Sequence, residues 1–169
     1  MFSFSGMAFV DFAHLRKENV KDGVLSYHRQ KSGSFIRVEI PADVRLLLDE
    51  LAVCTDKDSP YLFPFLSGKK TGEAAYAEYN GALLRFNRDL RSLAETCGVG
   101  EPVTSYTIRH SFATTLKEQD VPIEMISELL GHQSIKTTQI YLKSFSLDRM
   151  SAVNKACFES IYNEVSKVG

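Results

Sequence analysis

Three residues between positions 104 and 145 have the chemistry needed to attack a phosphate ester. Arg109 lies in a run that predicts a helix, His132 follows a Leu-Leu-Gly helix ending, and Tyr141 lies nine positions after His132. A guanidinium group is a rigid, bidentate clamp for an anionic phosphate. A phenol becomes a nucleophile when a base takes its proton, and an imidazole can move that proton. Together the three groups predict displacement at a phosphodiester.

The first element that must position this chemistry is a helix around Arg109. Its apolar residues recur every fourth position and predict one buried stripe: Ile108, Phe112 and Leu116. Thr104 or Ser105 can cap its start. Tyr106 and Arg109 lie on the neighbouring stripe, so we expect their side chains to project together.

Two shorter helices are expected after it. Asp120 is a good N-cap for the second helix, and Gly131 ends it by allowing a left-handed turn. The core positions of this helix are spaced as one face: Ile123, Ile126 and Leu130. Ser134 then caps a third helix, which carries Tyr141 near its end.

These runs resemble the tyrosine recombinases, or phage-type integrases. The resemblance is carried by residues 106–114, by Leu130-Gly131-His132 and by residues 137–141, and it is closest to the group on mobile elements of Bacteroides-like bacteria. Residues 6–11 with Leu15 look like the first box of the family, and residues 30–33 look like its lysine-bearing β-hairpin. Residues 1 to about 145 fit the family's catalytic domain.

The resemblance implies a role for each matching residue. Tyr141 would attack the phosphorus and form a 3′-phosphotyrosyl link, while Arg109 clamps the phosphate. His132 would stabilise the phosphate and move a proton, and Lys31 would protonate the departing 5′ oxygen. Tyr106 would donate a hydrogen bond to the phosphate or would only pack. The resemblance implies neither a metal ion nor another cofactor.

The sequence departs from the family at two positions. Ala8 stands where members usually carry the first of two phosphate-binding arginines, and Tyr106 stands where most carry a histidine. Arg29 is a candidate replacement, because alternation along its strand places it on the same face as the hairpin lysine. Arg37 and Arg16 are weaker candidates. The alternative is that Arg29 is an ordinary solvated strand residue.

The remaining pattern predicts a mainly α-helical domain with a small antiparallel β-sheet (α+β). Residues 2–16 are expected to form a helix with Asp11 and Arg16 on its polar side. The other expected elements are strands 24–29 and 35–40 joined by a turn at 31–34, a helix from 42 to about 53, a loop-rich segment 54–72 and a helix from about 74 to 97. Leu93 is expected on the core side of this last helix, and residues 146–169 have the spacing of a helical tail.

Composition sets limits on the class of protein. The 169 residues, 44% of them hydrophobic and with a net charge of -1, suit one globular domain. The three cysteines form no CxxC pair, and no apolar run is long enough for a membrane span. We therefore expect a cytoplasmic protein. From the resemblance, we expect a single catalytic domain, 1–169, that is a fragment lacking N-terminal DNA-binding domains, with a tail that packs either on its own domain or on a neighbouring protomer.

Two functions from different classes follow. The first is a recombinase that acts on double-stranded DNA as a homo-tetramer, in integration or excision of a mobile element, with no small-molecule substrate. The second is a non-catalytic DNA-binding module, because residues 122–142 read as two short helices about a turn and match a helix-turn-helix. Lys31 and Tyr141 separate the two, since a helix-turn-helix needs neither.

Overall fold

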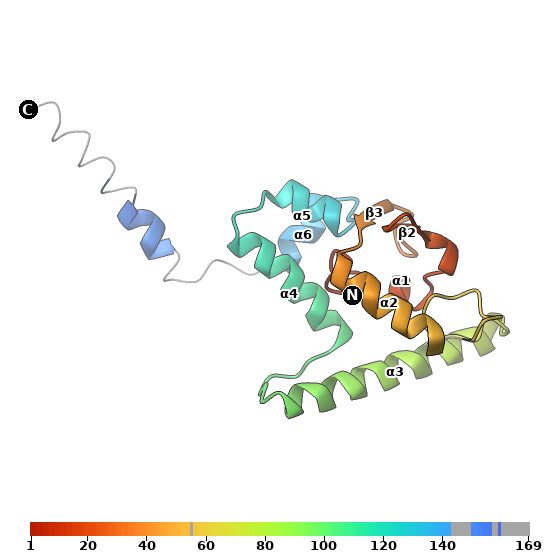
Figure 1. Ribbon diagram of the computed structural model, residues 1–169. Helices are drawn as coiled ribbons and strands as arrows, with labels where there is room; N and C mark the ends of the chain where they lie inside the picture. The colour runs from red at the N-terminus through yellow and green to blue at the C-terminus, as the bar shows by residue number, and fades with distance from the viewer. Residues whose placement is uncertain (55, 143–149, 157–158, 160–169) are drawn as a thin grey trace, which may run out of the picture.

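A computed structural model describes residues 1–54, 56–142, 150–156 and 159 of the chain. The fold is mainly helical with one small antiparallel sheet, the class that the sequence predicts (Figure 1). Its elements in order are α1 (Phe9–Ala13), the 3-10 helix η1 (Lys17–Asn19), β1 (Val20–Lys21), β2 (Val24–His28), β3 (Phe35–Glu39), α2 (Ala42–Cys54), α3 (Gly72–Thr96), α4 (Ser105–Glu118), α5 (Ile123–Leu129) and α6 (Ile135–Tyr141). Among the described residues no helix has both the length and the apolar character of a membrane span.

The sheet has the order β1-β2-β3, and both pairings are antiparallel. The expected turn between β2 and β3 is confirmed: the N–H of Arg29 donates to the carbonyl of Ser34 at 2.9 Å, and the N–H of Gly33 donates to the carbonyl of Arg29 at 2.8 Å. Gly33 has a φ of +69°, a conformation that glycine adopts at little cost. Strand β1 was not expected, because two residues are too few to show alternation.

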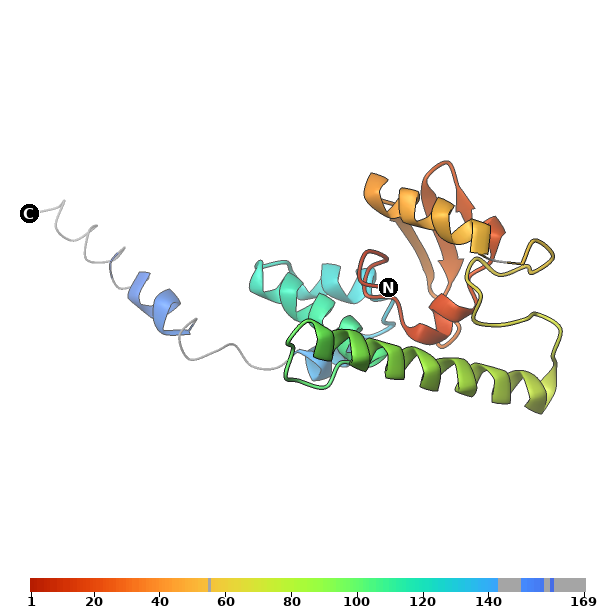
Figure 2. The same cartoon turned by 60° about the horizontal axis from the view of Figure 1, so that its bottom comes forward.

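The buried apolar residues form two hydrophobic clusters. The larger joins the N-terminal turn, α1, the sheet, residues 61–66 and α3, and the smaller joins α4 and α5 through Ala113, Ile126 and Leu130. Figure 2 shows α3 running along the bottom of the fold, where it contacts α1 on the side of the sheet and α4 on the side of the other helices. The long helix thus holds together the two halves from which the site is built.

The helix expected over residues 2–16 is wrong for its first half. Ser5 and Gly6 have φ values of +53° and +61°, which a right-handed helix cannot contain. Residues 1–7 instead form a compact turn, in which the N–H of Met7 donates to the carbonyl of Met1 at 3.2 Å, and α1 begins only at Phe9. Asp11 was also expected on a polar face, but it is 3% exposed.

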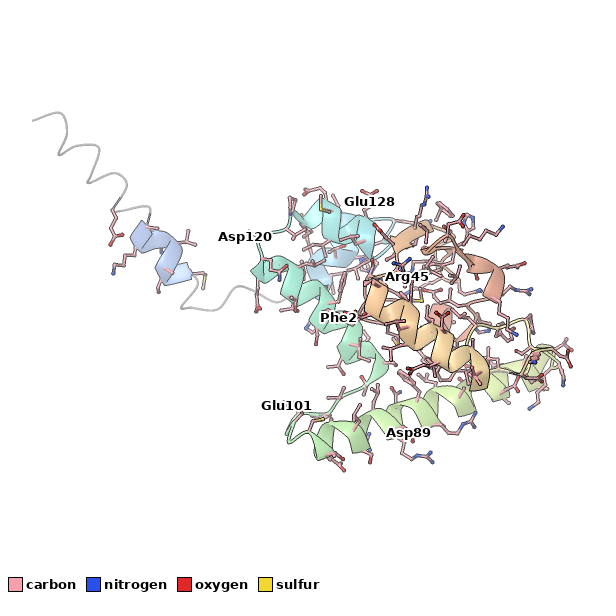
Figure 3. All side chains as sticks on the ribbon, viewed as in Figure 1. Phe2, Arg45, Asp89, Glu101, Asp120 and Glu128 are labelled. Atoms are coloured by element: carbon pink, nitrogen blue, oxygen red, sulfur yellow. The ribbon has the colours of Figure 1, made fainter. Side chains whose placement is uncertain are left out.

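Asp120 is not the N-cap of α5. It has a φ of +59° and ends α4, with its N–H donating to the carbonyl of Lys117 at 3.1 Å, and Pro122 occupies the N-cap position of α5. Figure 3 shows Asp120 at the corner where the chain leaves α4 for α5. A short polar side chain is tolerated in the left-handed conformation, so the residue type suited both positions.

Helix α4 begins as expected, because the hydroxyl of Thr104 accepts the N–H of Thr107 at 3.2 Å. Its most buried row is not the expected apolar stripe, whose members are only half-buried, but the row of Ser105, Arg109 and Ala113. Leu93, expected in the core side of α3, is exposed. The inward face of α4 thus combines the polar residue Arg109 with Ala113, which packs in the smaller hydrophobic cluster.

Helices α5 and α6 confirm the expected pair, with Gly131 at a φ of +63° ending the first. The N–H of His132 donates to the carbonyl of Ser127 at 2.9 Å, so the turn delivers His132 directly after the helix. Ser134 is the N-cap of α6, although its side chain makes no capping bond. In the expected tail, residues 150–156 are helical and exposed, whereas Phe158 and Ile161 lie outside the described residues.

We expect Gly131→Ala to destabilise the fold more than Gly33→Ala. Both glycines have positive φ, so each alanine costs about 1 to 2 kcal/mol in backbone strain. A Cβ at Gly131 would also lie 2.5 Å from Cδ of Arg29 and 2.7 Å from Cδ1 of Ile36, whereas one at Gly33 meets nothing within 4 Å. Displacing those side chains adds about 1 to 3 kcal/mol. Urea unfolding of both variants measures the difference, and equal losses would contradict the packing at Gly131.

Candidate active site

A pocket of about 510 Å³ lies between the two halves of the fold. It is lined from the start of α1, the β2–β3 turn, α3, the start of α4, the α5–α6 turn and α6. The structure brings four of the expected site residues to it: Arg109, His132, Lys31 and Tyr106. Tyr141 is the last residue of α6, which lines the pocket through Thr137, but the side chain of Tyr141 lies outside the described part of the structure.

Arg109 is 4% exposed and is held by backbone oxygens. Its Nη1 donates to the carbonyl of Gly6 at 2.7 Å, and its Nη2 donates to the carbonyl of Leu130 at 2.6 Å. The left-handed backbone at Gly6, which ended the expected N-terminal helix, belongs to the turn that supplies this carbonyl. The guanidinium is therefore fixed before any ligand binds.

Arg29 is the second buried guanidinium in the site, with 7% of its surface exposed. Its Nη1 donates to the carbonyls of Leu130 at 2.9 Å and Gly131 at 3.0 Å. Its Nε lies 3.4 Å from Oδ2 of Asp11, whose Oδ1 accepts the N–H of Gln30 at 2.8 Å. The interpretation of Arg29 as a solvated strand residue is wrong.

The other two candidates for the missing arginine do not reach the pocket. Arg37 and Arg16 are exposed, and Arg16 lies 3.9 Å from Glu18. Ala8, where the resemblance places an arginine, lines the same pocket as Arg29. The guanidinium of Arg29, which comes from the β2–β3 turn, therefore lies at the same pocket that an arginine at position 8 would line.

The charges of the site favour an anion. Arg29, Arg109 and Lys31 line the pocket, no carboxylate does so among the described residues, and Asp11 pairs with the buried Arg29. Burying charge without a matching partner is costly. The carbonyls at the C-terminal end of α5 reduce that cost, since they carry partial negative charge. A bound phosphate would supply the missing negative charge.

His132 is neutral in this setting. Burial, and after it the nearby charges of Arg109, Arg29 and Lys31, together lower the pKa of His132 from 6.5 to about 4. Its Nε2 lies 3.2 Å from Nη2 of Arg109, and its Nδ1 lies 2.9 Å from Oγ1 of Thr138. A neutral imidazole in contact with the phosphate clamp can accept a proton.

The hairpin that carries Lys31 is docked on the turn that carries His132. The hydroxyl of Ser32 donates to the carbonyl of Gly131 at 3.1 Å, and Nε2 of Gln133 donates to the carbonyl of Ser32 at 2.8 Å. Lys31 itself is exposed at the pocket rim. A flexible ammonium in that position can reach a leaving group once a substrate fills the pocket.

Tyr106 lines the pocket but does not share the burial of Arg109. It is 61% exposed, and its ring is stacked on that of His110, with 6.4 Å between centroids and 9° between planes. As expected, Tyr106 and Arg109 line the same pocket. They differ in burial, because Arg109 is buried and Tyr106 is exposed. Among the described residues, no three His, Cys, Asp or Glu side chains gather as a metal site.

Sequence reasoning missed two residues of the site, Asp11 and Thr138. Asp11 was assigned to a helix surface, although it lies in the first box, and Thr138 was used only as part of the run 137–141 that carries the resemblance, without a role in the site. The available signal for Asp11 was an acidic residue among Phe9, Val10 and Phe12, because a charge within an apolar run that is buried needs a partner. No sequence signal identified Thr138.

Comparison with known proteins gives consistent matches over this region. The profile of the phage integrase family matches residues 5–147. The tyrosine recombinase XerA of Pyrococcus furiosus is 29% identical over 154 residues, which are 90% of this chain and 51% of that protein. The chain therefore spans about half the length of this curated relative.

Solved structures match the fold. The XerH site-specific recombinase, bound to a palindromic difH substrate in a post-cleavage complex, has a TM-score of 0.69 at 20% identity, covering 90% of this chain and 42% of that one. A lambda integrase tetramer bound to a Holliday junction has a TM-score of 0.54 at 17% identity, covering 83% and 40%. These likenesses show a shared fold.

We expect Asp11→Asn to destabilise the chain by about 3 kcal/mol, because it leaves the buried guanidinium of Arg29 without its counter-charge. The matched control is Asp89→Asn, since Asp89 pairs with Arg88 at 3.0 Å on an exposed face of α3 and points away from the other elements (Figure 3). That change should cost no more than about 0.5 kcal/mol. Urea unfolding at neutral pH compares them, and equal small losses would show that the buried pair is not needed.

We expect His132 to remain neutral down to about pH 4, because its pKa is lowered to that value in the folded chain. The unfolded chain takes up this proton near the reference pKa of about 6.5, so it binds more protons than the folded chain between the two values. Folding stability contributed by this group is therefore present above about pH 6.5 and is lost as the pH falls toward 4. An NMR titration of the imidazole measures the pKa, and urea unfolding of His132→Gln should show a weaker acid loss. A midpoint near 6.5 would contradict the account.

Proposed function

The chain belongs to the phage integrase family, and from this premise we propose that it cleaves and rejoins DNA strands through a 3′-phosphotyrosyl intermediate. The observation that carries the proposal is the pair of buried guanidinium groups, Arg29 and Arg109, facing a pocket that no carboxylate of the described residues lines. A phosphodiester is anionic and gains charge on its non-bridging oxygens during displacement. Fixed donors in a partly dry site stabilise that charge more than water does.

The proposed reaction needs only groups of this chain and the DNA. The hydroxyl oxygen of Tyr141 forms a bond to phosphorus, and the bond from phosphorus to the 5′ oxygen breaks. The phenol proton passes to Nε2 of His132, which gives up its hydrogen bond from Nη2 of Arg109 to take it. Lys31 gives a proton to that leaving oxygen. The phosphotyrosyl ester conserves the energy of the phosphodiester bond. In rejoining, a 5′ hydroxyl attacks phosphorus, the oxygen of Tyr141 leaves, and the proton transfers run in reverse. Tyr106 donates a hydrogen bond to the phosphate from the rim.

Arg29 takes the place of the missing first arginine in this proposal. Its Nη1 and Nε are used by Leu130, Gly131 and Asp11, and no hydrogen bond to its Nη2 is present among the described residues. Among the described residues, every buried side-chain nitrogen or oxygen has a hydrogen-bond partner. Since Nη2 of Arg29 has none, it is not buried and is open to solvent. Because Arg29 lines the pocket, this Nη2 supports a role as the second phosphate donor.

The biological setting is the finer part of the proposal. We infer a catalytic domain, with residues 146–169 as a helical tail, that acts on double-stranded DNA as a homo-tetramer during integration or excision of a mobile element in the cytoplasm. The family match and the lambda integrase tetramer support this setting. The mobile-element role and the Bacteroides-type grouping rest on the sequence resemblance alone.

A non-catalytic helix-turn-helix remains the second candidate, because α5 and α6 have the expected lengths and turn. Its turn, however, is occupied by the site: the carbonyl of Gly131 accepts from Arg29 and Ser32, and His132 contacts Arg109. A DNA-reading turn needs none of these contacts. The pocket therefore favours the enzyme.

The chain should form a covalent adduct with nicked DNA, and Tyr141→Phe should abolish it. The probe is a pool of nicked duplexes with a randomised centre, in which loss of a short 5′-hydroxyl strand traps the intermediate. Adducts that survive detergent are recovered and sequenced, so no target site has to be known. His28→Ala is the control, since His28 is exposed and outside the pocket. DNA binding without any adduct would leave the helix-turn-helix function as the better account.

Loss of the Arg29 guanidinium should slow adduct formation by about 10²- to 10³-fold, the effect of removing one preorganised donor. Arg29→Lys is the main variant, because it keeps a positive charge beside Asp11 but loses the planar fork. Arg37→Lys on β3, exposed and outside the pocket, is the matched control and should leave the rate unchanged. The measurement is the single-turnover rate of adduct formation on a captured duplex. Equal rates for Arg29→Lys and Arg37→Lys would exclude Arg29 as the replacement for the arginine that is absent at position 8.

A further inference from the structure

Thr138 is a buried hydroxyl that the proposed reaction does not use. It is 0% exposed and lies in the middle of α6, and its Oγ1 is 2.9 Å from Nδ1 of His132. Tyr141 follows three residues later, at the end of the same helix. The side chain of Thr138 thus contacts the imidazole of His132, and its backbone is part of the helix that ends at Tyr141.

The partners of His132 decide which ring nitrogen carries the proton. Arg109 only donates hydrogen bonds, so Nε2, at 3.2 Å from its Nη2, must present a lone pair. In the neutral imidazole the proton is then on Nδ1, which donates to Oγ1 of Thr138. The lowered pKa of His132 is consistent with this neutral form. The tautomer is assigned here from the hydrogen-bond partners.

We propose that Thr138 is a positioning residue, whose hydroxyl holds the Nδ1–H of His132 so that the Nε2 lone pair stays directed at Nη2 of Arg109 beside the pocket, on a ring tied to the helix that ends at Tyr141. The inference rests on the proposed function for its catalytic meaning. A base must be in the correct tautomer and within reach of the proton it takes. The hydrogen bond between Thr138 and His132 serves both needs. It fixes the proton on Nδ1, and it ties the imidazole ring to the helix that carries the nucleophile.

The competing explanation is that Thr138 only fills space in the core. A buried threonine has a methyl group and a hydroxyl, and a packing role needs the shape alone. Valine keeps the shape and removes the hydroxyl, serine keeps the hydroxyl and removes the methyl, and alanine removes both. Comparing the three variants at position 138 separates hydrogen bonding from packing, and the serine and alanine pair still does so where valine disturbs the fold.

The first arm of the test observes the bond without any catalysis. Nitrogen-15 NMR of the chain near pH 7 should show His132 as the Nδ1–H tautomer with a slowly exchanging ring proton, and His132→Gln identifies its signals. Thr138→Val and Thr138→Ala should lose the slow exchange, whereas Thr138→Ser should keep it. An Nε2–H tautomer in the parent chain, or a ring proton unchanged by valine and alanine, would overturn the proposal.

The second arm measures adduct formation with the captured nicked duplexes. Valine and alanine at position 138 should slow it about tenfold, the effect of one lost hydrogen bond, with DNA binding unchanged, and serine should stay within about threefold of the parent. Serine as slow as alanine would assign Thr138 to packing and overturn the proposal. If the parent forms no adduct while the NMR results hold, the strand-cleavage function fails and the positioning bond stands.

Discussion

The carbonyl oxygen of Leu130, at the end of α5, is the contact on which the site depends. It accepts Nη1 of Arg29 at 2.9 Å and Nη2 of Arg109 at 2.6 Å, and so joins the β-hairpin, α4 and α5 at one atom. The next residue, Gly131, must adopt a positive φ for the chain to turn there, and it has no Cβ that would push Arg29 away. The helix end therefore sets the spacing between the two guanidinium groups before DNA arrives.

This arrangement explains why the site carries more positive charge than its surroundings balance. Asp11 pairs with Arg29, and carbonyls at the end of α5 accept hydrogen bonds from both buried arginines. Burial, together with the nearby charges of Arg109, Arg29 and Lys31, lowers the pKa of His132 and keeps its imidazole neutral. The same cationic groups therefore line the phosphate pocket and help to hold the imidazole in its neutral form. A fold with a fully balanced cluster would be more stable and would bind phosphate less well.

The sequence predicted the features whose causes are local. The glycine at 131 placed the helix end before His132, and strand alternation grouped Arg29 with Tyr27, both of which are buried, although Lys31 of the same row is exposed. Contacts between distant segments were not predictable from spacing, such as the reach of Arg29 to the carbonyl of Leu130, 101 positions away. The wrong expectation for residues 2–16 has the same origin: apolar periodicity favours a helix, but the turn is held by contacts with α4. Asp120 shows that one residue type can serve two turn geometries.

The most direct test of the two-arginine site is a crystal structure of the chain with orthovanadate and the two strands of a captured duplex cut at the cleavage position. Vanadate bridging the phenol of Tyr141 and the 5′ oxygen would mimic the pentacoordinate state. We expect Nη2 of Arg29 and the guanidinium of Arg109 both to lie within hydrogen-bond distance of its equatorial oxygens, opposite Nε2 of His132. A vanadate contacted by Arg109 and by a different arginine, with Arg29 still bound only to Asp11 and the backbone, would contradict the account.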